Sequence, residues 1–321
     1  MRCLLSIAVM FFFSVSIATA GADETAPSLI ANGRVDEAIA RLYGQISASP
    51  NDALAHNLLC RAYFSLGEWD RGISNCEKAV ALAPNNSQFH LWLGRIYGEK
   101  ADGSAFVTAA GLARRVRSEF ETAVRLNPAN LDARSDLAEF YLEAPGLVGG
   151  GRAKAEAEAS SLATMDPTIA HWVKARIAEK RKDFPAAEQE YRAAITTSHG
   201  SASAWVNLGL FYKHRQQLDN MEEALLHVRP APLDRPDALV DAAEILIHTR
   251  RNLPEATQLL RAYLTSNAKV EQAPAFKVHF LLGNANEQLG HKKDAASEYR
   301  LALSMAREFR PAQQALQRVS Q

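Results

Sequence analysis

Apolar and small residues recur along the chain with the spacing of amphipathic helices. A leucine is followed four positions later by a tyrosine in Leu59–Tyr63 and in Leu93–Tyr97, which places both side chains on one helical face. Farther along, small and aromatic residues recur at helical spacing in Ala187, Tyr191 and Ala194. The pattern predicts an all-α chain built of antiparallel helix pairs that bury these faces against each other.

The pattern has a period. Leu59-Cys60-x-x-Tyr63 recurs as Leu93-Gly94-x-x-Tyr97, 34 residues later, and Pro50 and Pro84 are also 34 residues apart. Later copies are Leu137-Ala138-x-x-Tyr141, Leu208-Gly209-x-x-Tyr212 and, more weakly, Leu282-Gly283 followed by Asn286. One helix pair cannot bury its apolar face alone, so the pairs are expected to stack into an extended array.

These motifs resemble the tetratricopeptide repeat, W-x2-L-G-x2-Y…A-x3-F…P, from about residue 25 to the end of the chain. The resemblance implies a right-handed superhelical solenoid of about 7–8 units over residues 21–309, followed by a capping helix over 310–321. It also implies a non-catalytic scaffold that binds a protein or peptide in a concave groove lined by the first helices. No cofactor is implied.

The groove-facing positions of the repeat can be assigned in this sequence. They are Asn57, Arg61, Trp92, Arg95, Glu139, Trp172 and Arg176. Arginine and tryptophan are favoured at binding hot spots, so these residues are predicted to contact the partner. The alternative is that they pack along the groove and stay solvated. The Lys and Asn set with which chaperone-binding members of the family clamp a terminal carboxylate is absent.

Two units are longer than the period. Tyr97 and Tyr141 are 44 residues apart, and Pro128 and Pro167 are 39 residues apart. The extra residues are predicted to form turn insertions near 100–113 and 144–152, between the two helices of a unit. Equivalent turns emerge on one edge of such an array, so the insertions should be neighbours that mark a binding edge.

The second insertion, PGLVGGGRA, resembles the phosphate loop GxxxxGK(S/T). A helix precedes it instead of a strand, and Arg152 and Ala153 replace Lys and Ser/Thr, so nucleotide binding is not predicted. Two interpretations remain. The glycines provide the conformational freedom for a chain reversal, or the N–H groups of Gly149, Gly150 and Gly151 form an anion-binding nest beside Arg152.

Cysteine and histidine also take repeat positions. Cys60 and Cys76 face one helix–helix interface, which predicts either a disulfide or two small buried apolar side chains. Copies of another position, each in its own unit, hold His56, His90, His171 and His279. Residues in separate units cannot converge on one ion, so no metal site is predicted.

The first twenty residues differ from the rest. Arg2 precedes an apolar run from Leu4 to about Ile17, and Ala18-Thr19-Ala20 follows. This is the pattern of a secretory signal peptide, residues 1–20, cleaved after Ala20. An uncleaved anchor is the alternative. The mature protein is therefore expected to be soluble, without an integral membrane segment, in the periplasm or outside the cell.

The charge balance adds one alternative. The chain carries 36 basic and 36 acidic residues, which argues against a nucleic-acid binder. Basic residues nevertheless gather on the predicted turn edge: Lys180-Arg181-Lys182, Lys213-His214-Arg215, Arg250-Arg251, Lys292-Lys293, Arg114, Arg115, Arg117 and Arg152. These cations either complement helix dipoles, or the protein is a cell-envelope assembly factor that docks through them on an anionic polymer or membrane. Edge docking is expected to weaken with salt, unlike groove binding through Trp and apolar contacts. No catalytic motif or residue pair stands out, so an enzyme is not predicted.

Overall fold

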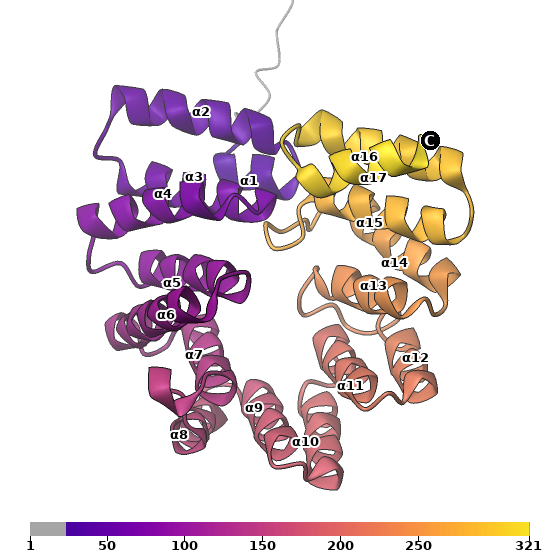
Figure 1. Cartoon of the computed structure of the whole chain (residues 1–321). Helices are drawn as coiled ribbons and strands as arrows, with labels where there is room; N and C mark the ends of the chain where they lie inside the picture. Colours follow the sequence, from indigo (N-terminus) through magenta and orange to yellow (C-terminus); the bar gives the residue numbers. More distant parts are fainter. Residues whose placement is uncertain (1–23, 321) are drawn as a thin grey trace, which may run out of the picture.

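The computed structural model describes residues 24–320, which form seventeen α-helices, one short 3-10 helix and no strand (Figure 1). The helices are α1 (Ala26–Ala31), α2 (Val35–Ala48), α3 (Ala53–Leu66), α4 (Trp69–Leu82), α5 (Ser87–Asp102), α6 (Phe106–Leu126), α7 (Leu131–Glu143), η1 (Gly146–Val148), α8 (Arg152–Ala163), α9 (Pro167–Lys180), α10 (Phe184–Thr197), α11 (Ala202–His214), α12 (Leu218–Leu226), α13 (Ala238–Thr249), α14 (Leu253–Thr265), α15 (Ala275–Gln288), α16 (Lys292–Met305) and α17 (Arg310–Val319). The predicted all-α solenoid of helix pairs is confirmed. The predicted signal peptide lies outside the described residues, and none of the helices in 24–320 is both long and apolar enough to cross a membrane.

The small residue of each repeat motif lies where the second helix crosses the first. A Cβ on Gly94 of α5 would lie 2.4 Å from the ring of Phe120 in α6, and one on Gly283 of α15 would lie 2.3 Å from the ring of Tyr299 in α16. The motif residues themselves are buried, with Tyr63 fully enclosed. Glycine at this position therefore lets an aromatic ring pack directly on the neighbouring backbone.

The repeated histidines and tyrosines form two kinds of polar pair. Nδ1 of His171 in α9 lies 2.7 Å from a carboxylate oxygen of Glu190 in α10, within one helix pair. The hydroxyl of Tyr97 in α5 donates to Glu77 in α4, at 2.6 Å, between neighbouring pairs. The hydrogen bond that His90 donates to the Glu119 carboxylate raises the pKa of His90. The histidines are thus used inside their own hairpins, and no group of metal-binding side chains is found within the described residues.

The first insertion is helical. Only residues 103–105 separate α5 from α6, and α6 is 21 residues long. The turn insertion predicted at 100–113 is therefore wrong, because this alanine-rich segment lacks proline and continues the helix. The second insertion does form a turn, with η1 inside it.

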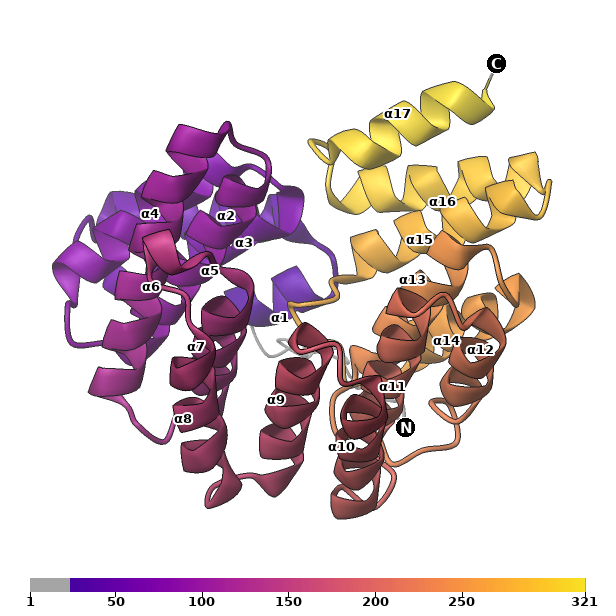
Figure 2. The same ribbon diagram turned by 60° about the horizontal axis from the view of Figure 1, so that its bottom comes forward.

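The array curves round until its last helices meet its first (Figures 1 and 2). Leu29 and Ile30 of α1 share one apolar cluster with Phe276 of α15 and with Phe309, just before α17. Around this cluster, Asp36 accepts hydrogen bonds from the Arg307 side chain, at 2.8 Å, and backbone. The chain therefore closes into a ring, which the repeat pattern did not predict.

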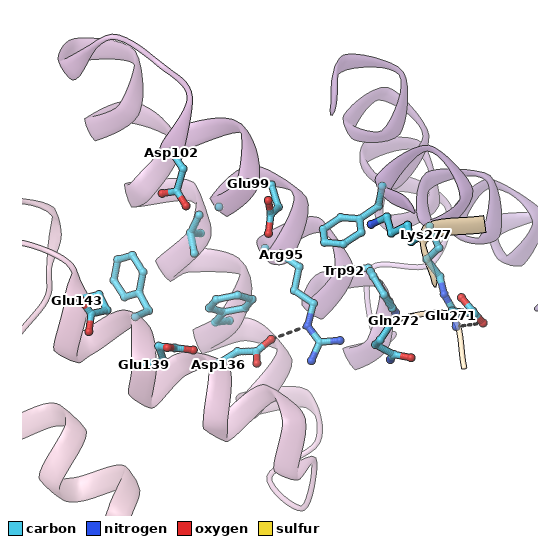
Figure 3. A pocket seen from close by; sticks show the side chains of 17 residues that line it. Trp92, Arg95, Glu99, Asp102, Asp136, Glu139, Glu143, Glu271, Gln272 and Lys277 are labelled. Atoms are coloured by element: carbon cyan, nitrogen blue, oxygen red, sulfur yellow. Dashed lines mark hydrogen bonds and ion pairs between the residues drawn. The ribbon is translucent and has the colours of Figure 1, made fainter. Parts of the chain in front are cut away.

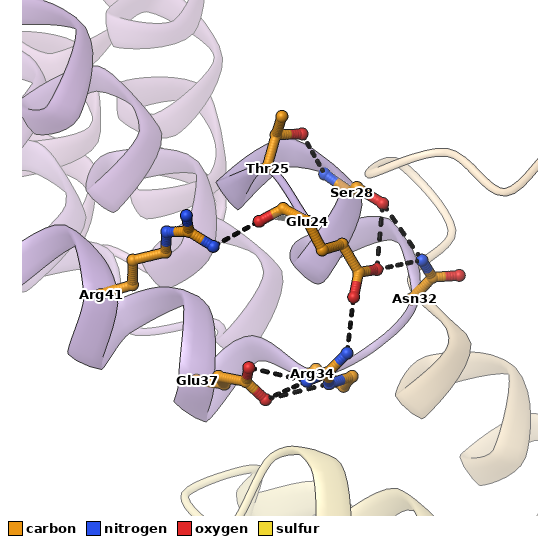
Figure 4. A network of polar contacts seen from close by, with 7 residues as sticks. All are labelled: Glu24, Thr25, Ser28, Asn32, Arg34, Glu37 and Arg41. Atoms are coloured by element: carbon orange, nitrogen blue, oxygen red, sulfur yellow. Dashed lines mark hydrogen bonds and ion pairs between the residues drawn. The ribbon is translucent and has the colours of Figure 1, made fainter. Parts of the chain in front are cut away.

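The closing contact depends on the turn between α1 and α2. Gly33 in this turn has a φ of +82°, and a Cβ there would lie 2.6 Å from the backbone nitrogen of Phe276. Glu24 holds the turn, because its carboxylate accepts hydrogen bonds from Ser28, at 3.0 Å, and Asn32, at 2.7 Å, and pairs with Arg34 (Figure 4). The turn is thus preformed for close approach to α15.

Replacing Gly33 by alanine tests the closure. Alanine at positive φ costs about 1–2 kcal/mol, and the clash with α15 adds to this cost. We expect Gly33→Ala to lower the free energy of unfolding by about 2 kcal/mol or more, measured by urea denaturation. Gly44→Ala is the matched control, since Gly44 lies inside α2 with open space around it; it should stabilise slightly. Equal stability of the two variants would contradict this account of the ring contact.

Cys60 of α3 and Cys76 of α4 form a disulfide, with their Cα atoms 5.3 Å apart. Both residues are fully buried in the interface between the two helices. The disulfide therefore links the two helices of one hairpin near the start of the ring.

The disulfide has a measurable effect on stability. Linking residues 16 apart restricts the unfolded chain, which for a loop of this length is worth about 3 kcal/mol. We expect the double variant Cys60→Ala with Cys76→Ala to lose about that much unfolding free energy in denaturant titrations. Thiol counting in denatured, unreduced protein exported to an oxidising compartment should find neither cysteine free; two free thiols there would exclude the bond.

Candidate functional site

A groove follows the inner face of the ring. One cavity of about 460 Å³ lies between α3, α5, α6 and α7 on one side and the α14–α15 connection and α15 on the other (Figure 3). A second cavity, of about 560 Å³, continues across α7, α9 and α11. Both are lined by Arg95, Asp136 and Glu139. We call the two joined cavities the inner groove.

Most of the residues predicted for the groove do lie along it. Those lining it are Arg61, Trp92, Arg95, Glu139 and Trp172. Arg176 lies beside it and pairs with Glu143, which lines the first cavity, at 2.7 Å. Asn57 is only 1% exposed in α3, inside the helix packing. The repeat register thus placed most of the predicted residues in the groove lining, while Asn57, on the same helical face as Arg61, is buried and does not line either cavity.

The predicted arginines are held by the protein itself. The guanidinium groups of Arg61 and Arg95 lie 5.0 Å and 5.2 Å from the ring centre of Trp92. Arg61 also pairs with Glu271, and Arg95 pairs with Asp136 at 2.6 Å. These contacts make the arginines and Trp92 a rigid floor of the first cavity, with most of their charge already balanced.

The wall opposite this floor comes from distant sequence. Glu271 and Gln272 lie in the α14–α15 connection, and Lys277 lies in α15 (Figure 3). Burial raises the pKa of Glu271 and lowers the pKa of Lys277. The repeat spacing does not predict these residues, because only ring closure brings them to the groove.

Two other groove residues had a signal in the sequence. Asp136 and Asn207 stand five positions before the motif tyrosines Tyr141 and Tyr212, as Trp92 stands before Tyr97. All three side chains line the groove. Reading this position through every repeat would have found them.

Acidic side chains dominate the groove. Its carboxylates are Glu99, Asp102, Asp132, Asp136, Glu139, Glu143, Asp166, Asp234 and Glu271, and its cations are Arg61, Arg95, Arg235 and Lys277. Burial raises the pKa of Glu99 and of Glu139, and the cations nearby offset this only in part. The groove therefore has a negative potential although the whole chain is neutral.

The glycine loop of the second insertion is a chain reversal. Gly149 has a φ of +100°, and a Cβ on Gly150 would lie 1.8 Å from the carbonyl oxygen of Ala144. The N–H groups of Gly149, Gly150 and Gly151 all donate to backbone carbonyls of the same turn or the end of α7. They do not form the predicted anion-binding nest, since none of the three points to an open site.

Arg152 follows this turn in the sequence, and Arg117 of the lengthened α6 contacts the turn. The Arg152 side chain, 62% exposed, lies 3.5 Å from Glu156 of its own helix. Arg117 of α6 donates to the carbonyl of Val148, at 3.4 Å. The lengthened α6 therefore contacts the turn of the second insertion through Arg117, outside the predicted first insertion, and the two do not build an anion site together.

Several cations of the basic edge are used within the array. Lys180 pairs with Glu143 at 2.6 Å, and Arg251 pairs with Glu222 at 2.9 Å. The guanidinium of Arg215 lies 3.5 Å from the ring centre of Phe184. These contacts account for much of the edge by internal pairing, so nothing in them supports docking on an anionic polymer.

Comparisons with known proteins agree with the repeat architecture. Tetratricopeptide repeat models match residues 29–74 and 276–309. Yeast Tom70 is similar in structure, with a TM-score of 0.53 and 14% identity over 97% of this chain and 66% of that one. A search of curated protein sequences gives no match.

Two bacterial structures are less similar. A thermophilic TPR protein of Thermus thermophilus has a TM-score of 0.48 and 20% identity, over 58% of this chain and 94% of its own. A tetratricopeptide repeat protein of Parabacteroides merdae has a TM-score of 0.46 and 14% identity, over 92% of this chain and 96% of its own. At such identities a likeness bears on the fold alone. With two matched segments near the ends of the array and the same helix pair repeated between them, this chain is a tetratricopeptide repeat protein.

Proposed function

We propose that the protein is a non-catalytic scaffold that holds an extended segment of a partner protein in the inner groove. The continuity of the groove from α5 through α7 and α9 to α11 carries this proposal. Helices pack about 10 Å apart, so four neighbouring first helices span about 30 Å. An extended chain covers that length with about nine residues.

The lining of the second cavity suits such a segment. Trp172 presents a partly exposed aromatic surface to it, which is a side-chain type favoured at hot spots. The Asn207 amide and the Ser135 hydroxyl also line it, and neither makes a hydrogen bond within residues 24–320. Free amide and hydroxyl groups can pair with the backbone of a bound peptide.

The edge that carries the insertions is a second contact in this proposal. Phe106 and Val107, at the start of the lengthened α6, are 78% and 82% exposed. Large apolar side chains so open to water support a partner contact at this end of the helix. The groove remains the main binding surface, because it offers both shape and polar groups.

We further propose that the protein acts in the periplasm or outside the cell. The pattern of residues 1–20 supports export. The disulfide between Cys60 and Cys76 is of a kind that persists in oxidising compartments.

Blocking the groove tests the main proposal. Asn207→Tyr places a bulky neutral side chain in the second cavity, and we expect it to reduce recovery of co-purifying partner proteins at least about tenfold. Quantitative mass spectrometry of proteins captured by the tagged full chain measures this recovery.

The matched control is Gln258→Tyr. Gln258 is an exposed amide on α14, outside the groove, and makes no hydrogen bond within the described part of the chain. This variant should recover partners as the wild type does. Groove binding is rejected when Asn207→Tyr, with unchanged thermal stability, recovers the same partners in the same amounts.

The proposed export has its own test. We expect the protein purified from its native cells to begin at Gly21, because cleavage after Ala20 removes residues 1–20. N-terminal sequencing of the extracytoplasmic fraction measures this directly. A chain that starts at Met1 in the membrane fraction would support the anchor instead.

A further inference from the structure

Three of the four cations of the inner groove, Arg61, Arg95 and Arg235, are already matched to carboxylates. The fourth, Lys277, makes no ion pair within residues 24–320, and burial lowers its pKa. Arg95 contacts Asp136 at 2.6 Å, and its guanidinium lies 3.7 Å from Asp132. Arg235 contacts Asp241 at 2.9 Å. A partner's acidic groups would have to compete with these intramolecular pairs, so the groove is poorly suited to an anionic ligand.

Some carboxylates of the groove have no such match. Glu99 and Asp102 lie one helical turn apart near the end of α5, and both face the first cavity (Figure 3). Neither makes a hydrogen bond or ion pair within residues 24–320, and Lys277 acts on Glu99 only over a longer distance. Glu139, between the two cavities, pairs with Arg176 at 3.7 Å, and it shares this cation with Glu143 and Glu179. The unpaired carboxylates therefore lie at Glu99 and Asp102 in the first cavity, and Glu139 has only a share of one cation.

A separate observation points to a bound ligand. Ser201, at the start of α11, is only 3% exposed and lines the second cavity. Its hydroxyl has no hydrogen-bond partner within the described residues, and neither has the second carboxylate oxygen of Glu271 in the first cavity. Buried polar atoms without partners cost about 1–3 kcal/mol each. One such atom lies in the lining of each cavity of the groove, where a polar chain can offer it a hydrogen bond.

We propose that the segment held by the inner groove is basic, with lysine or arginine side chains placed against Glu99, Asp102 and Glu139. This inference rests on the proposed peptide-binding function and names the chemistry of the partner. The basic side chains neutralise Glu99 and Glu139, which burial has made costly to ionise, and pair with the exposed carboxylate of Asp102. The peptide backbone supplies donors and acceptors to Ser201 and Asn207, which a simple polyamine, having donors only, does not.

Selection from a random peptide library tests this inference. The purified full chain, with its disulfide, is immobilised and panned against phage-displayed random dodecapeptides, and the selected sequences are then synthesised with a fluorescent label. We expect enrichment of lysine and arginine. We also expect binding, measured by fluorescence anisotropy, to weaken at least about tenfold in the double variant Glu99→Gln with Asp102→Asn.

The control variant removes the same charges elsewhere. Glu223 of α12 and Asp294 of α16 are exposed, lie outside the groove and make no ion pair in the described chain. Glu223→Gln with Asp294→Asn should leave the affinity within about twofold of the wild type, because these charges are remote from the groove. If both double variants weaken peptide binding equally, the effect comes from the net charge of the protein and not from the groove, and the inference is overturned.

The remaining outcomes separate the inference from the proposed function. Selected peptides that are acidic or apolar, and that Asn207→Tyr blocks, would leave groove binding standing and overturn its basic specificity. Peptides that Asn207→Tyr does not block, or no enrichment at all, would overturn both. Spermidine that binds the groove while basic peptides do not would also overturn the inference, because the ligand would then be a small polyamine.

Discussion

The apolar contact between the first and last helices is the constraint on which the rest of the molecule depends. An array of stacked hairpins has two free ends, and each end exposes an apolar face. Here Leu29 and Ile30 at one end pack with Phe276 and Phe309 at the other, so each end covers the other. Closure also gives the inner groove a second wall, since Glu271 and Lys277 reach it only from the far end of the chain.

Closure requires particular residues in parts of the sequence that are far apart. Gly33 must lack a side chain so that the first turn can touch α15, and the network around Glu24 must hold that turn in place. The Arg61–Glu271 pair then joins the two walls inside the groove. Binding in the groove and stability of the ring are therefore coupled, because a ligand that contacts both walls stabilises the closed form.

The parts of this structure that sequence reasoning could reach are those that depend on local spacing. The 34-residue period places Leu59 and Tyr63 in a hairpin interface, and it puts Arg61, Trp92 and Arg95 on the inner face. Ring closure depends on the small rotation added at each repeat, which the motif residues do not record. The first insertion was misassigned for a related reason, since the period counts extra residues without saying whether they continue a helix.

The groove is acidic although the whole chain has no net charge. Acidic and basic residues balance over the sequence, yet the repeat places carboxylates inside the ring while clusters of cations end the first helices. This segregation changes how binding modes can be told apart. Docking through the basic edge was expected to weaken with salt while groove binding was not, but an acidic groove that holds a basic segment is screened by salt as well. The sign of the partner's charge separates the two surfaces, because an anionic partner is attracted to the edge and a cationic one to Glu99, Asp102 and Glu139 in the groove.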